Sequence, residues 1–159
     1  LSVRINIPVF YAFLLSAALL QLGFCAYYGF FALYLLDLGY SSQATGWLVA
    51  LGVLAEVIIF LQAGKLITLF GVKWILVISI LLTALRWYLL AIAANNPVIL
   101  IVSQVLHAFS FGMTHAASMH FIHHYFGNKL QSQGQAIYIS VGFGIGGAIG
   151  GYGAGYFWQ

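Results

Sequence analysis

The chain has 159 residues, of which 64% are hydrophobic and only 4% are charged. Soluble domains carry about 25% charged residues, so this composition excludes a soluble protein and predicts an all-α integral membrane protein. Cys25 is the only cysteine, which excludes a disulfide framework and a thiolate metal cluster.

Apolar runs and the breakers between them predict five transmembrane helices. The predicted spans cover residues 9–38, 44–69, 73–94, 98–126 and 131–158. A turn-like segment at 37–43 follows the first span, and Asn95-Asn96-Pro97 separates the third span from the fourth.

Basic residues fix the predicted orientation. Arg4 precedes the first span, Lys65 and Lys73 flank the second loop, and Lys129 lies in the fourth loop. The first and third loops carry no Lys or Arg, so the positive-inside rule places the N-terminus in the cytoplasm. The formal charge of +3 therefore mainly reflects basic loops that stay in the cytoplasm, and we expect no nucleic-acid partner. The chain stops directly after the last span, from which we expect a fragment of a longer protein.

The first span contains a polar-aromatic stretch within an apolar helix, formed by Gln21, Tyr27, Tyr28 and Tyr34. Two interpretations stay open for it. The rings could serve ordinary aromatic packing, or the amide and hydroxyl groups could line a substrate cavity.

Three ionisable groups lie deep in three successive spans. At 1.5 Å per residue, Glu56 and Arg86 lie about 18 Å from the ends of their helices and His107 about 15 Å. A charge at this depth costs roughly 2.5 kcal/mol or more, so it must face protein or water. We therefore expect Glu56 and Arg86 to pair, with His107 at the same level.

This polar group has a structural and a functional interpretation. A Glu56–Arg86 pair could simply tie two helices together, although buried ion pairs often fail to recover their desolvation cost. Alternatively, the carboxylate changes protonation when substrate or water arrives, which predicts a proton- or substrate-handling site.

The fourth span carries all five histidines. His107 and His115 are eight residues apart, which places them about 80° apart around a helix, so both can border one cavity. The other three, His120, His123 and His124, lie near the cytoplasmic end and are typical of interfacial residues.

Histidine-dependent metal enzymes need separate consideration. His115, His120, His123 and His124 resemble the histidine boxes of di-iron membrane desaturases, whose site needs about eight imidazoles from separate segments. A b-type haem needs axial histidines from two helices. Because every histidine here lies on one helix, we expect no metal, no cofactor and no enzymatic activity.

The last predicted span is rich in glycine. Two interlaced stripes with four-residue spacing result, Gly142/Gly146/Gly150 and Gly147/Gly151/Gly155. Such stripes let helix backbones approach closely in lipid, so we predict helix packing. A phosphate-binding loop is excluded because neither the preceding strand nor the P-loop lysine is present.

Several motifs in chain order resemble a known family. The loop at 64–73 keeps Gly64, Gly71 and Lys73 of the cytoplasmic motif of the major facilitator superfamily. More specific are A-Y-Y-G-F-F-A-L-Y from Ala26, G-V-L-A-E-V-I-I-F from Gly52, the R-W at Arg86 and the V-L-H that ends at His107. Together they resemble the C-terminal half of the 3-phenylpropionic acid transporter group, in the lactose permease and nucleoside–proton symporter branch.

The resemblance implies that residues 1–159 form an incomplete C-terminal six-helix half, equivalent to spans seven to eleven of a twelve-helix transporter. It implies a bacterial inner membrane and an N-terminal half as partner. In lactose permease, a Glu, an Arg and a His on successive helices serve sugar recognition and proton coupling. Arg86 and His107 match that Arg and His, Glu56 falls about one turn later than the Glu, and Ser110 replaces a second proton-transferring Glu.

We therefore expect a proton-coupled symporter of a small organic solute, such as an aromatic acid, a sugar or a nucleoside. Glu56 and His107 would handle the proton. The expected substrate-binding residues are Arg86, Tyr27, Tyr28, Gln21 and His115. The competing hypothesis is a non-transporting membrane protein with a structural Glu–Arg pair.

Overall fold

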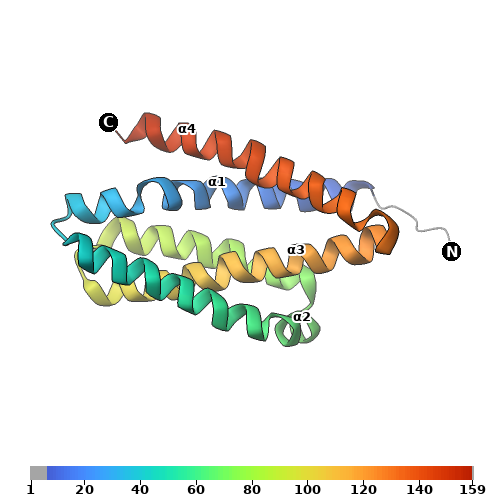
Figure 1. The fold of residues 1–159 in the computed structure, drawn as a ribbon, viewed down its shortest axis with the longest axis horizontal. Coiled ribbons are helices and arrows are strands. Elements are labelled where there is room, and N and C mark those ends of the chain that lie inside the picture. Colours follow the sequence, from blue (N-terminus) through green and yellow to red (C-terminus); the bar gives the residue numbers. More distant parts are fainter. Residues whose placement is uncertain (1–6, 159) are drawn as a thin grey trace. The chain divides into compact units, whose positions relative to one another are not determined.

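The computed structural model describes residues 7–158, which contain helices and no strand (Figure 1). Arg4 lies outside the described residues. The elements follow in the order α1 (Ile7–Asp37), α2 (Ser42–Ala93), α3 (Pro97–Ile139), the π-helix η1 (Ser140–Gly146) and α4 (Gly147–Phe157). The all-helical membrane class predicted from composition is confirmed.

Three continuous helical stretches are long and apolar enough to cross a membrane, namely Ile7–Asp37, Ser42–Ala93 and Pro97–Phe157. The second and third are much longer than the roughly 20 residues that one crossing needs. Each is interrupted by one glycine with non-helical backbone angles, Gly71 (φ 75°, ψ 156°) and Gly127 (φ 65°, ψ 178°). The predicted count of five spans stays a prediction.

The two glycine breaks have a simple conformational cause. Both residues have a positive φ, which glycine adopts without the steric cost that a Cβ would add. At Gly71 the chain reverses its direction, so that α2 consists of two arms, 42–70 and 72–93 (Figure 1). The two breaks fall within the predicted loops at 70–72 and 127–130.

Side-chain caps start two of the helices. The Ser41 hydroxyl accepts a hydrogen bond from the Ala44 backbone N–H at 3.1 Å at the start of α2. The Asn96 side-chain oxygen accepts one from the Val98 N–H at 2.9 Å at the start of α3. Each cap satisfies a donor that the first helical turn leaves unpaired.

The chain forms two compact units. One contains the part of α1 up to Phe30 together with the chain from Ser118 onward, and the other contains Phe31–Ala117. We call them the terminal unit and the central unit and describe each by itself.

The central unit joins both arms of α2 to the first part of α3. Its apolar cluster draws members from all three segments: Ala63, Ile67, Ile75, Met113 and Ala117. Two tyrosines from the end of α1 and the following turn add polar anchors. Tyr34 donates its hydroxyl proton to the Leu90 carbonyl at 3.0 Å, and Tyr40 donates to the Ala94 carbonyl at 3.1 Å.

The terminal unit packs the glycine-rich end of the chain against α1. A Cβ added at Gly146 would lie 3.1 Å from Ala18 Cα, and one added at Gly150 would lie 2.9 Å from Leu22 Cα. Backbones therefore touch at these two glycines. Around Gly142, Gly147 and Gly155 the contacts are looser, and Gly151 faces open space.

Candidate functional site

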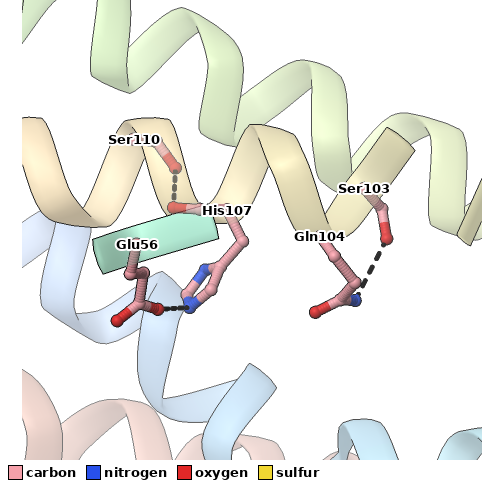
Figure 2. A network of polar contacts seen from close by, with 5 residues as sticks. All are labelled: Glu56, Ser103, Gln104, His107 and Ser110. Carbon is pink, nitrogen blue, oxygen red and sulfur yellow. Dashed lines mark hydrogen bonds and ion pairs between the residues drawn. The ribbon is translucent and has the colours of Figure 1, made fainter. Parts of the chain in front are cut away.

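The central unit brings Glu56 and His107 together from two helices. Glu56 lies on the first arm of α2 and His107 on α3, and Glu56 Oε1 is 3.5 Å from His107 Nε2 (Figure 2). The His107 side chain is 1% exposed and that of Glu56 18%. The two groups that depth counting placed at one level thus meet across the interface between these helices.

A glycine allows this approach. A Cβ added at Gly112 of α3 would lie 3.2 Å from Ile59 Cγ2 on the first arm of α2. Ile59 is almost one helical turn beyond Glu56, and Gly112 is five residues beyond His107. The absence of a side chain at Gly112 therefore keeps the two helices close beside the carboxylate–imidazole contact.

Arg86 is the third member of this group and is fully buried. It comes from the second arm of α2, and its guanidinium carbon lies 4.9 Å from the centroid of the Trp87 ring, a cation–π distance. The direct pair between Glu56 and Arg86 stays a prediction, whereas the ionic contact that Glu56 makes in the structure is with His107.

His115 lies in an aromatic column along α3. The Phe111 ring stacks between His107 and His115, with centroid distances of 5.7 and 6.5 Å and interplanar angles of 18° and 17°. Phe60, one turn beyond Glu56, meets His115 edge-on at 6.3 Å. His107 and His115 therefore border the same helix interface, as their spacing suggests.

Polar neighbours of His107 were not singled out as site residues by the sequence analysis. Gln104 and Ser103 are fully buried one turn before His107, and Gln104 Nε2 donates to Ser103 Oγ at 3.3 Å (Figure 2). Ser110 donates to the His107 carbonyl at 3.2 Å. These residues could have been found from their spacing, because residues three or four positions from His107 lie on the same face of the helix.

The predicted contributors from the first span belong to the terminal unit. Gln21 and Tyr27 are buried there, whereas Tyr28 is 55% exposed. The Tyr27 and Tyr28 rings lie edge-to-face with centroids 5.3 Å apart. Their part in substrate binding stays a prediction.

The remaining histidines make local contacts near the break at Gly127. His123 Nδ1 donates to Gln131 Oε1 at 3.0 Å, and His124 Nδ1 donates to the His120 carbonyl at 3.0 Å. Within residues 7–158, no group of three or more His, Cys, Asp or Glu side chains is arranged to hold a metal ion.

Comparison with known proteins identifies the family. The MFS_1 like family matches residues 3–159. The probable 3-phenylpropionic acid transporter of Escherichia coli (strain K12) is 38% identical over 132 residues, which cover 83% of this chain and 34% of that protein. The chain thus spans about a third of the length of this relative. No solved structure gives a significant match. With its membrane-length helices and its buried polar group, the chain belongs to the MFS_1 like family of major facilitator transporters.

Proposed function

We propose that the chain is part of a proton-coupled transporter that moves a small organic acid by alternating access. Secondary transporters of this architecture bind substrate and coupling ion near the bilayer midplane, at the interface between two halves. In this proposal the chain supplies five spans of the C-terminal half, and an N-terminal half completes the site. The protein performs transport and no covalent chemistry.

The observation that carries the proposal is the contact between Glu56 and His107, in a unit that also buries Arg86. A carboxylate and an imidazole in contact hold one proton in either of two places, on the Glu56 oxygen or on the His107 nitrogen. A charge at membrane depth costs about 2.5–3.5 kcal/mol on insertion scales, so proton uptake by Glu56 removes a large penalty. The pair is therefore suited to load and release a proton during transport.

Arg86 gives the proposal its substrate class. A buried guanidinium recognises a carboxylate through charge-assisted hydrogen bonds, and the rings of His107, Phe111 and His115 form an aromatic column on α3. An aromatic acid matches both features. The name of the Escherichia coli relative, a probable 3-phenylpropionic acid transporter, supports the same class. Neutral sugars and nucleosides lack the carboxylate that a guanidinium would bind, so they match these features less well.

The test is a Glu56→Gln variant of the complete transporter in proteoliposomes. We expect accumulation driven by a proton gradient to fall about tenfold or more, while energy-independent exchange continues. Asp37→Asn is the matched control, because Asp37 is the only other acidic residue of the chain and lies at the end of α1. Normal accumulation by Glu56→Gln would show that the carboxylate does not couple.

A charge exchange tests the structural interpretation. If Glu56→Arg/Arg86→Glu restores both folding and full transport, the two residues serve mainly to balance charge. Restored folding without transport supports chemistry at these positions. Uptake of 3-phenylpropionate, a galactoside and a nucleoside by the unaltered protein then tests the substrate class, and preference for either neutral solute would contradict it.

A further inference from the structure

Two rows of buried polar residues face the interior of the central unit. One lies on the second arm of α2 and one on α3, and within each row the members are three or four residues apart, so they share a helix face. Every member is at most 8% exposed. The rows consist of Ser79, Thr83 and Arg86 on α2, and of His107, Ser110 and Thr114 on α3.

The two rows run side by side in antiparallel register. Ile75 of α2 packs in one cluster with Met113 and Ala117 of α3, so these residues lie at about the same height along the two helices. At the other end the two helices are joined by the short connection between Ala93 of α2 and Pro97 of α3, so they run antiparallel. From these two levels and the rise per residue of a helix, we infer that Thr83 lies near the level of Ser110, and Ser79 near that of Thr114.

The hydroxyl groups between these levels keep hydrogen-bonding capacity. Thr83 donates to the Ser79 carbonyl at 2.8 Å and Ser110 to the His107 carbonyl at 3.2 Å, so both hydroxyl oxygens retain their acceptor sites. Within residues 7–158, Ser79 Oγ and Thr114 Oγ1 have no hydrogen-bond partner. A buried hydroxyl without a partner costs about 1–3 kcal/mol, and buried water is the usual remedy at a polar site.

We propose that these four hydroxyl residues form a hydrated row that carries protons to and from the Glu56–His107 pair. Along such a row each hydroxyl or water oxygen accepts a proton on one side and releases another on the far side. One proton moves, and every hydroxyl group and water molecule is left as it was. The far end of the row meets the apolar cluster around Ile75, which closes the hydrated path in this conformation, so protons pass beyond the cluster only when alternating access opens it.

The competing explanation is that the hydroxyls only join the two helices. Serine and threonine do bond across membrane helices, with about 0.6 kcal/mol per contact on average. If that is their role, removal of the hydroxyls should lower the stability of the protein and reduce proton-driven accumulation and energy-independent exchange equally. A proton row predicts loss of the proton-driven mode alone.

The first measurement uses the Ser79→Ala/Thr114→Val double variant of the complete transporter. We expect proton-driven accumulation to fall about tenfold while energy-independent exchange is kept. Thr45→Val is the matched control: Thr45 is 6% exposed and its hydroxyl also has no partner within residues 7–158, but it lies at the start of α2, outside the row. Unchanged accumulation in the double variant, or an equal loss of accumulation and exchange, would overturn the proposal.

The second measurement detects water without transport. Thr114→Cys and Ile75→Cys are each made with Cys25 replaced by alanine, exposed to Ag⁺, and then denatured so that the remaining thiols are counted with a maleimide. We expect Ag⁺ to block the cysteine at 114 and to spare the one at 75. Equal blocking or equal sparing at the two positions would contradict a hydrated row that ends at the apolar cluster.

This proposal rests on the proposed proton coupling, but the two fail in different experiments. Failure of the coupling appears as normal accumulation in Glu56→Gln, which leaves the Ag⁺ pattern intact. Failure of the row appears in the Ag⁺ pattern or in the double variant, whatever Glu56→Gln does.

Discussion

Replacement of Gly150 by alanine tests the close contact between α4 and α1. The added Cβ would lie 2.9 Å from Leu22 Cα and 3.0 Å from the Leu22 carbonyl carbon, and would also clash with the Leu22 carbonyl oxygen. Ordinary contacts begin near 3.4 Å, so relief of all three contacts requires the two backbones to separate by about 0.5–1 Å at this level. Backbone atoms have no alternative rotamer with which to avoid the clash.

The magnitude follows from two opposing effects. Alanine is about 1 kcal/mol more favourable than glycine inside a helix, whereas overpacking a tight contact costs about 1–3 kcal/mol. We therefore expect Gly150→Ala to be neutral or to destabilise the protein by up to about 2 kcal/mol. Gly151→Ala is the matched control because nothing lies within 4 Å of its added Cβ. This neighbour should gain stability, by up to about 1 kcal/mol.

The assay is thermal unfolding of both variants of the complete protein in the same detergent. The expected difference of about 1–3 kcal/mol corresponds to several degrees in Tm, at roughly 2–4 °C per kcal/mol. Gly150→Ala should melt below Gly151→Ala, and also below the unaltered protein if the contact is rigid. Equal Tm values for the two variants would refute the inference that α4 touches the α1 backbone at Gly150.

Two further substitutions test the helix ends. Gly71→Ala should destabilise the protein by about 1 kcal/mol or more, because φ there is +75°. Gly64→Ala, at an open helical position, should not, and equal Tm values for the pair would contradict the strained turn. Asn96→Ala should cost about 0.5–2 kcal/mol through loss of the cap on the Val98 N–H. Asn95→Ala is its control, and equal unfolding midpoints would show that the cap contributes nothing.

The helical pattern was predictable because apolar length and breakers act locally. Asn95-Asn96-Pro97 predicts a helix end, and α2 ends at Ala93 and α3 begins at Pro97. The sharpness of the turns at Gly71 and Gly127 was not predictable, since either glycine could equally have continued a helix. Whether a glycine takes a positive φ depends on how the arms on either side pack. The π-helix at Ser140–Gly146 likewise has no local sequence signature that distinguishes it from an α-helix.

The level of the candidate site was predictable, but the pattern of contacts within it was not. Depth counting placed Glu56, Arg86 and His107 at one level because the rise per residue of a helix is constant. It gives no information on how far each helix is rotated about its axis or which helices are adjacent. The expected pair of Glu56 with Arg86 stays a prediction, and of the two residues expected near Glu56 the structure shows His107 against the carboxylate. The proposed row through Ser79 and Thr114 was not predictable from the sequence, because serine and threonine are common in membrane helices.

Exposure separates the roles of the three ionisable groups. Arg86 is 0% exposed and His107 1%, whereas the Glu56 side chain keeps 18% of its surface accessible. Arginine keeps its proton under all physiological conditions, so Arg86 supplies a fixed positive charge. Glu56 is thus the most exposed of these three side chains, and a single proton would remove its charge. In the proposed coupling, a proton would reach His107 either through Glu56 or along the hydroxyl row. The Ser79→Ala/Thr114→Val change and Glu56→Gln would then impair the same proton transfer. We therefore expect the combined variant to lose little more proton-driven accumulation than Glu56→Gln alone.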